Sequence, residues 1–340
     1  MFHIWHWPGY LRGMNDFVLT PLLFYVAIRA LVKTKRARWI LLIALAAGGV
    51  LVAGIGWWKW LQGTSIAADG INRLVGTHYS PNHTALYLLR TLFLLIGLQL
   101  STPRSSLSTI HYPLSTILVF SALWLTASRG ALLLGLPAGI VILLWPIRQN
   151  IFGVKPASET KFLRKKSIYK YVLLTGTALL FIIVAIITFY PNLFGQYSTR
   201  LANSETLFRR LGIWQTTLRL WLDHPMGVGP GGFYWLYPAD IPLQRLQDLE
   251  PNLRHPHNVW LEFGATAGWL GLLWLIGWLV WLKYAAVDAW KESPKSWLKL
   301  GLIASLVASL AHAQVDAFMM LADLAGWFWV VMGVWEEPEV

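Results

Sequence analysis

The stretch that decides the fold is His255-Pro256-His257-Asn258-Val259-Trp260-Leu261-Glu262, followed by Phe263-Gly264-Ala265-Thr266-Ala267-Gly268-Trp269-Leu270-Gly271. A long polar segment ends here, and an apolar run begins that continues to Leu282. A run of this length is expected to cross the hydrocarbon core of a bilayer, which is about 30 Å thick. The two histidines therefore stand where water meets lipid, and an imidazole there can take or give a proton near neutral pH.

The composition of the whole chain is that of a membrane protein. It is 56% hydrophobic and only 13% charged, whereas soluble proteins carry about 25% charged residues. The net charge of +12 does not indicate a nucleic-acid partner, because the basic residues cluster in short connections between apolar runs, as membrane topology requires. The absence of cysteine excludes both a disulfide framework and a thiolate metal site.

Apolar runs recur along the chain and predict about nine membrane spans. They lie at Phe17–Val32, Trp39–Trp58, Thr84–Leu100, Leu114–Thr126, Ala131–Ile147, Tyr171–Tyr190, Val259–Leu282, Trp297–Ala311 and Ala317–Trp335. Backbone polar groups must be paired in lipid, and these runs are too long for barrel strands. The predicted fold class is therefore all-α, a polytopic transmembrane helical bundle.

Lysine and arginine are concentrated in alternate connections, which sets the orientation of the bundle. The basic connections hold Lys33, Lys35, Arg36, Arg38, Arg148, Lys155, Lys161, Arg164, Lys165, Lys166, Lys170, Lys283, Lys291 and Lys295. With nine spans these connections all face the cytoplasm, and the long connection Pro191–His257 faces outward. Met1 then lies outside without an ordinary signal peptide. Either the N-terminus is translocated as it stands or upstream helices are missing from this sequence, and we favour the second interpretation.

The predicted organisation has three parts. Residues 1–190 form N-terminal transmembrane helices, residues 191–258 form the outer loop, and residues 259–340 form C-terminal transmembrane helices. Within the loop, Leu207, Leu211, Trp214 and Leu218 recur at helical spacing and predict an amphipathic helix on the outer face. Arg210 and Trp214 are one turn apart and share a face of that helix.

A glycine-rich segment follows the loop helix, at Met226-Gly227-Val228-Gly229-Pro230-Gly231-Gly232-Phe233. It lacks the Gly-Lys-Ser/Thr ending of a phosphate-binding P-loop. A tight turn at a crowded bundle mouth is the favoured interpretation, with phosphate binding as the alternative.

Several polar residues at the predicted membrane boundary are candidate site residues, and each has a structural alternative. His257 is the strongest, although a histidine at a helix start can simply bond to backbone. Arg129, in Ser128-Arg129-Gly130, either serves a site or reaches the interface. Asn82 either lines the same site or caps the third span. Arg90 and Asp316 are weaker candidates of the same kind.

A metal centre is not expected among these residues. His255 and His257 could form a His-x-His pair, but no nearby carboxylate or histidine has convincing ligand spacing. The chain also has no His-Glu-x-x-His, no Asp-x-Asp pair and no Walker loop. These absences count against nucleotide-sugar transferases and ATP-driven pumps.

The combined motifs resemble the O-antigen ligase and polymerase family of bacterial envelope glycosyltransferases. His257-Asn258 is followed by nine residues and then by Gly268-x-x-Gly271, which is the family's spacing. Arg210-x-x-x-Trp214, the glycine-rich segment and Ser128-Arg129-Gly130 are similar to further family sequences. Family members commonly carry more spans, with both ends in the cytoplasm, which agrees with upstream helices missing here.

The resemblance implies a GT-C-like, metal-independent membrane glycosyltransferase without a cofactor. Its donor would be an undecaprenyl-diphosphate-linked glycan, and its acceptor a hydroxyl on a glycan, lipid or protein. The implied location is the bacterial cytoplasmic (inner) membrane, with the large loop facing the periplasm. Whether the chain is a ligase, a polymerase or a protein glycosylation enzyme stays open.

A division of labour follows as a hypothesis. His257 would be the general base on the acceptor hydroxyl, and Arg210 and Arg129 would hold the diphosphate. The further candidates for substrate binding are Arg209, Arg254, His255, Asn258, Trp214 and Asn82. The rival function is a transporter or flippase for a lipid-linked or anionic solute, which predicts internal repeats and broken helices. A non-catalytic scaffold is the third possibility.

Overall fold

The computed structural model describes residues 7–68, 71–102, 106–151, 205–242, 249–292, 297–316 and 322–335. The chain divides into two compact units, each assembled from separated segments. The first unit comprises Met1–Leu41, Asn203–Tyr284 and Leu310–Val340, and the second comprises Leu42–Ala202 and Ala285–Ser309. Each unit is described by itself.

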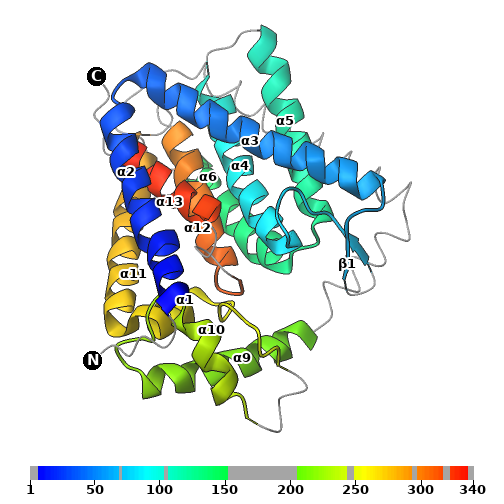
Figure 1. The fold of residues 1–340 in the computed structure, drawn as a ribbon. Helices are drawn as coiled ribbons and strands as arrows, with labels where there is room; N and C mark the ends of the chain where they lie inside the picture. The colour runs from blue at the N-terminus through cyan, green and yellow to red at the C-terminus, as the bar shows by residue number, and fades with distance from the viewer. Residues whose placement is uncertain are drawn as a thin grey trace. The chain divides into compact units, whose positions relative to one another are not determined.

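Helices make up most of the described residues of the first unit. They are α1 (Trp7–Met14), the π-helix η1 (Asn15–Leu19), α2 (Thr20–Leu31), α9 (Glu205–Asp223), α10 (Gly232–Leu236), the short 3-10 helix η3 (Tyr237–Asp240), α11 (Val259–Glu292, to Tyr284 in this unit) and α13 (Ala322–Trp335). α2 packs along α13, where Tyr25 meets Trp329 with ring centroids 5.7 Å apart (Figure 1).

The second unit holds the remaining helices and a hairpin. They are α3 (Lys35–Leu61, from Leu42 in this unit), β1 (Ile66–Ala68), β2 (Ile71–Arg73), α4 (Pro81–Ser101), α5 (Ser106–Leu125), the π-helix η2 (Gly130–Gly135), α6 (Leu136–Ile151), the end of α11 from Ala285, and α12 (Trp297–His312, to Ser309 in this unit). The hairpin is antiparallel and pairs Ile66 with Arg73. It is a small departure from the all-α prediction, and the sequence pair Asp69-Gly70 between the strands is a hairpin signal.

The apolar helices of the described residues lie where the sequence predicts spans. Three are long enough to cross a membrane, at Lys35–Leu61, Pro81–Ser101 and Val259–Lys291. Shorter apolar helices lie at Thr20–Leu31, Ile110–Leu125, Gly130–Trp145, Trp297–His312 and Ala325–Trp335. The predicted span Tyr171–Tyr190 lies outside the described residues. The helical fold is confirmed, while the total of nine spans and the outward loop stay predictions.

α4 is the most enclosed of the three long helices. Its apolar window is 72% buried, whereas those of α3 and α11 are 33% buried. Within the second unit α4 crosses α12 at two glycines, since a Cβ on Gly97 would come 3.0 Å from the Cα of Gly301. Arg90 of α4 is fully buried and donates from Nε to Ser309 Oγ at 2.7 Å. Arg90 therefore joins α4 to α12 in the interior of this unit.

The apolar core of the first unit packs α9 against the start of α11, and Figure 1 shows α9 next to the end of α11 at which that helix begins. The core is a buried apolar cluster of Ile213, Leu220, Phe233, Tyr237, Ile241, Leu249, Leu253 and Ala265. Ile213 and Leu220 come from α9, and Ala265 comes from α11. The predicted amphipathic helix is thus a packed part of this unit and not only a surface helix.

α11 is broken at Gly268, nine residues after it begins. Gly268 has φ 61° and ψ −146°, a conformation that only glycine adopts without strain. The glycine-rich segment hydrogen-bonds to the carbonyl groups freed at the break. Val228 N–H donates to Ala265 O at 2.7 Å, and Gly229 N–H donates to Thr266 O at 2.9 Å. This segment is a structural turn, as the favoured interpretation expects.

Candidate functional site

Asn258 caps α11 and sets the position of His257. Its Oδ1 accepts two N–H groups from the first helical turn, at 3.0 and 3.1 Å, which is the standard N-cap arrangement. Its Nδ2 donates to Gln314 O at 3.0 Å, and Val259 N–H donates to Ala313 O at 2.9 Å. The cap thereby binds the start of α11 to the turn that follows α12. Asn258 is a positioning residue in this geometry.

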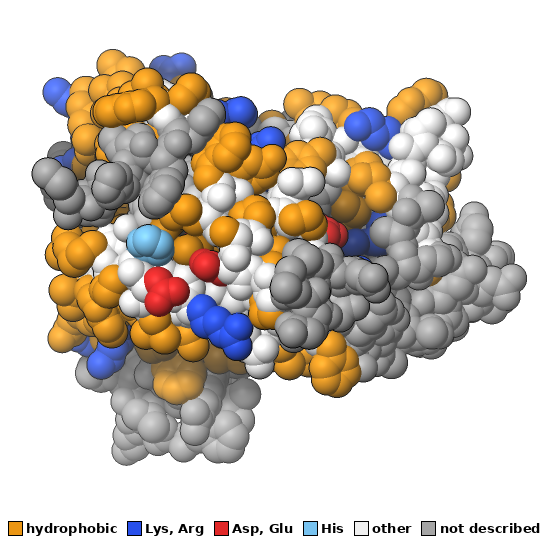
Figure 2. Space-filling model, turned by 60° about the horizontal axis from the view of Figure 1, so that its bottom comes forward, with side chains coloured by type: hydrophobic (Ala, Val, Ile, Leu, Met, Phe, Trp, Pro, Cys, Tyr) orange, Lys and Arg blue, Asp and Glu red, His pale blue; other side chains and the backbone are white. Residues whose placement is uncertain are grey.

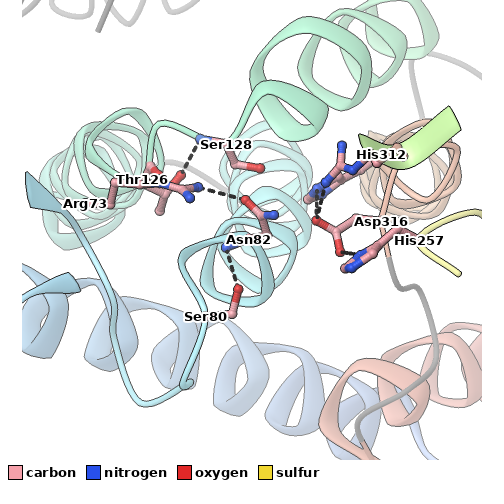
Figure 3. Close-up of polar contacts among 9 residues, drawn as sticks. Arg73, Ser80, Asn82, Thr126, Ser128, His257, His312 and Asp316 are labelled. Atoms are coloured by element: carbon pink, nitrogen blue, oxygen red, sulfur yellow. Dashed lines mark hydrogen bonds and ion pairs between the residues drawn. The ribbon is translucent and has the colours of Figure 1, made fainter. Parts of the chain in front are cut away.

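His257 and Asp316 form a hydrogen-bonded pair across this junction (Figure 3). His257 Nδ1 lies 3.1 Å from Asp316 Oδ1, and the Asp316 side chain is only 3% exposed. With the proton on Nδ1 donated to the carboxylate, Nε2 is left with a lone pair that can accept a proton. His257 also has φ 54°, an uncommon backbone conformation that histidine tolerates better than most residues.

Arg210 reaches the same carboxylate from α9. Its Nη2 lies 3.5 Å from Asp316 Oδ2, and its side chain is 15% exposed. One turn further along α9, Trp214 Nε1 donates to Pro256 O at 3.1 Å. The shared face predicted for Arg210 and Trp214 therefore points toward the segment that carries His257. Arg210 adds a fixed positive charge beside the histidine.

His312 completes the group around Asp316. Its Nε2 lies 3.9 Å from Asp316 Oδ2, and its side chain is 1% exposed. Burial alone would raise the pKa of Asp316, but the hydrogen bond and charge of His257, with Arg210 and His312, hold that pKa well below its ordinary value. Asp316 is thus an ionised, buried carboxylate that can stabilise a proton taken up by His257.

The group around Asp316 is not arranged as a metal site. Within the part of the chain that the structure describes, no three His, Asp or Glu side chains are placed to hold an ion. A guanidinium occupies one side of the carboxylate, at Arg210, and a guanidinium does not ligate cations.

The remaining candidates of this unit lie around the group in different ways. His255 is buried and meets His257 edge to face, with ring centroids 4.4 Å apart and an interplanar angle of 77°. The His255 ring therefore packs against the ring of the catalytic candidate. Arg209 and Arg254 are exposed, so neither is built into the Asp316 group as Arg210 is.

Asn82 lies in the second unit and is held by a residue that the sequence did not single out. Arg73 donates from Nη2 to Asn82 Oδ1 at 2.8 Å and from Nε to Thr126 O at 2.8 Å (Figure 3). Ser80 caps α4, because its Oγ accepts the Asn82 N–H at 3.2 Å. Asn82 itself is therefore not the capping residue.

Arg129 also lies in the second unit, directly before η2. It is half-buried. Two residues earlier, Ala127 has φ 48°, which is strained backbone for a residue with a Cβ. Arg73 binds the carbonyl of Thr126 within this turn. The turn that presents Arg129 is therefore held from the β2 strand.

Sequence reasoning ranked Asp316 low and did not find His312 or Arg73. Asp316 is 59 positions from His257 and 106 from Arg210, so spacing along the chain carries no sign of their contact. The available signal was chemical: a carboxylate at the end of an apolar helix must be paired or functional. Only the tertiary structure, in which Asp316 lies in the turn after α12, shows which residues are its partners.

A family model described as O-antigen ligase matches residues 114–276. The matched residues include Arg129, Arg210 and His257, whereas Asp316 lies beyond them. A search of curated proteins found no match.

Proposed function

We propose that the chain belongs to the O-antigen ligase family, whose model matches residues 114–276, and that it is a membrane glycosyltransferase that uses an undecaprenyl-diphosphate-linked glycan as donor. The family and the apolar helices are those of an integral membrane protein. The acceptor is a hydroxyl on a glycan, lipid or protein. The proposed location is the bacterial inner membrane, with residues 191–258 facing the periplasm.

The observation that carries the proposal is the contact of His257 with buried Asp316 at 3.1 Å. In this arrangement Nε2 of His257 removes the proton from the acceptor hydroxyl as the oxygen attacks the anomeric carbon. Asp316 stabilises the imidazolium that forms. General-base catalysis of this kind contributes about 10²–10⁴-fold in rate.

The leaving group is the second part of the proposal. The bond between the anomeric carbon and the diphosphate breaks, and negative charge builds on the lipid diphosphate. Arg210, beside His257 in the first unit, is proposed to bind that charge. Arg129 is proposed for the same task on sequence grounds, with Arg209 and Arg254 as further contacts. Attack opposite the leaving group inverts the anomeric carbon.

The proposed transfer requires neither a metal ion nor ATP. The diphosphate linkage of the donor already carries the driving force, and guanidinium charge takes the place of a cation at the leaving group. The carboxylate nearest to His257 is engaged by His257, Arg210 and His312.

The test is transfer by purified protein supplied with the lipid-diphosphate glycan and candidate acceptors, with EDTA and without ATP. We expect wild-type product, and a fall in kcat on the order of 10²–10⁴-fold for His257→Ala and for Asp316→Asn. His111→Ala is the matched control, because His111 is exposed on α5. Near-normal transfer by His257→Ala would contradict the assignment of His257 as the general base.

A carrier of a lipid-linked or anionic solute is the alternative, and the break in α11 at Gly268 is the observation that favours it. The freed carbonyl groups at the break are hydrogen-bonded by the glycine-rich segment, which favours a structural role for the break. The same preparation separates the two functions: a carrier would move labelled donor across a vesicle membrane and form no product.

A further inference from the structure

α9 presents three different faces along its length. One face is buried in the core of the first unit and includes Ile213, Thr217 and Leu220. A second face carries Arg210 and Trp214 toward the His257 segment. The third face is apolar and exposed, formed by Leu207 (48%), Phe208 (62%), Leu211 (40%), Leu218 (43%) and Leu222 (65%). We call this third set the α9 ledge.

The ledge is a contiguous stripe and not a scatter of single residues. Leu207, Leu211, Leu218 and Leu222 are spaced by multiples of the helical repeat and share one side of α9. Isolated exposed leucines are ordinary, but a stripe of this kind marks an interaction surface. Exposed arginines at Arg209 and Arg219 lie on the same helix outside the stripe. Apolar side chains bordered by arginines suit the boundary between acyl chains and phosphate headgroups.

The contacts of α9 indicate lipid as the occupant of this surface. Trp221 of α9 meets Trp269 of α11 edge to face, with ring centroids 5.0 Å apart, and a Cβ on Gly264 would come 3.0 Å from the Trp221 ring. α9 therefore lies across the beginning of a candidate span. The first residues of α11 after its break are themselves exposed and apolar, with Trp269 at 57% and Leu270 at 62%.

The apolar surface thus continues from the span onto the loop helix within one unit. Figure 2 shows hydrophobic side chains over much of the face that is turned forward, with charged side chains in small groups between them. Because α9 packs against the end of the candidate span in α11, it lies at the level expected for the bilayer surface. Binding of a soluble protein partner would not explain why the stripe continues onto a helix that is a candidate membrane span.

We propose that the α9 ledge is embedded in the headgroup–acyl boundary of the leaflet next to the outer loop, and that this lipid surface is its partner. The ledge and the Arg210–Trp214 face are adjacent sides of one rigid helix. Embedding the ledge consequently holds Arg210 at the depth of lipid phosphates. Together with the proposed function, this places the donor diphosphate within reach of Arg210 while its polyprenyl chain stays in the bilayer.

The test uses single cysteines, because the natural chain has none. Leu211→Cys and Leu218→Cys are labelled with an environment-sensitive fluorophore and reconstituted into vesicles of phosphatidylethanolamine and phosphatidylglycerol with brominated acyl chains. We expect strong bromine quenching at both positions and little at the control Glu250→Cys, which is exposed elsewhere in the loop. Equal, weak quenching at all three positions would overturn the proposal.

Bromine quenching does not depend on catalysis, so its result tests the lipid contact of the α9 ledge separately from the proposed function. A second measurement compares Leu211→Asp/Leu218→Asp with Leu211→Ile/Leu218→Ile in the transfer assay. The Asp pair is expected to raise the KM for the lipid-linked donor several-fold, and the Ile pair to leave it unchanged. The fluorophores could instead be shielded from water without bromine quenching, to a degree that depends on protein concentration. That result would show a second copy of the chain on the α9 ledge and would also overturn the proposal.

Discussion

His257 combines an uncommon backbone conformation with a specific side-chain partner. A positive φ at a residue with a side chain costs about 1–3 kcal/mol, and at His257 the value is 54°. The N-cap at Asn258 and the contact with Asp316 hold the residue there. In this conformation the imidazole Nδ1 lies 3.1 Å from Asp316 Oδ1.

Asp316 makes the stability of the fold depend on pH, and the surroundings of its carboxylate set the sign of that dependence. Burial would raise its pKa, but His257, Arg210 and His312 together hold the pKa well below the ordinary value. A depressed folded-state pKa contributes stability that is present above the unfolded value of about 3.9 and is lost as pH falls through the folded value. We expect the thermal midpoint of the wild type to fall as the pH is lowered below about 4.

Asp316→Asn should flatten this acid dependence, because the variant has no carboxylate to protonate at that position. The measurement is the thermal midpoint of the detergent-solubilised protein as a function of pH. Asp288→Asn is the matched control, since Asp288 is exposed on α11, and it should keep the wild-type profile. An unchanged profile for Asp316→Asn would refute the assigned ion pairs.

At the scale of elements, the break in α11 separates a short helix that begins beside His257 from the longer span that follows. The break is stabilised by hydrogen bonds that the glycine-rich segment donates and by Trp269 N–H, which donates to Pro225 O at 3.3 Å. The break therefore joins the segment around Pro225–Gly229 to residues 265–269 of α11. The conformation of Gly268 gives the first glycine of Gly268-x-x-Gly271 a physical reason.

Gly268→Ala is expected to destabilise the protein by roughly 1–3 kcal/mol. Alanine is strained at φ 61°, and its Cβ would collide with the backbone of Pro225 and Met226. Gly277→Ala is the control in the same helix, because a Cβ there meets nothing within 4 Å. The measurement is thermal or denaturant unfolding of both variants. Equal stability of the two would show that the break is not needed.

At the scale of the molecule, each compact unit is assembled from segments far apart in the chain. The family match ends at residue 276, yet the carboxylate that orients His257 comes from the turn after α12. The matched region therefore does not contain the whole candidate site. Function at this scale also depends on which side of the membrane the outer loop faces.

The proposed orientation can be tested in intact cells with single-cysteine variants. Glu250→Cys in the outer loop should react with a membrane-impermeant thiol reagent added outside. Asp288→Cys, near the end of α11 and beside predicted cytoplasmic lysines, should react only after the membrane is permeabilised. Both side chains are exposed in the structure, so burial does not account for a lack of reaction. The reverse pattern would invert the topology.

The sequence by itself determined the helical class and the positions of the described apolar helices, and it singled out His257 and Arg210 as candidate site residues. It could do so because hydrophobic run length and motif spacing are local properties that lipid and helix geometry convert directly into structure. Only the tertiary structure decided that Asp316 and His312 join His257, that Arg73 holds Asn82, and that α11 breaks at Gly268. These features depend on contacts between distant segments, for which the order of residues carries no local signal.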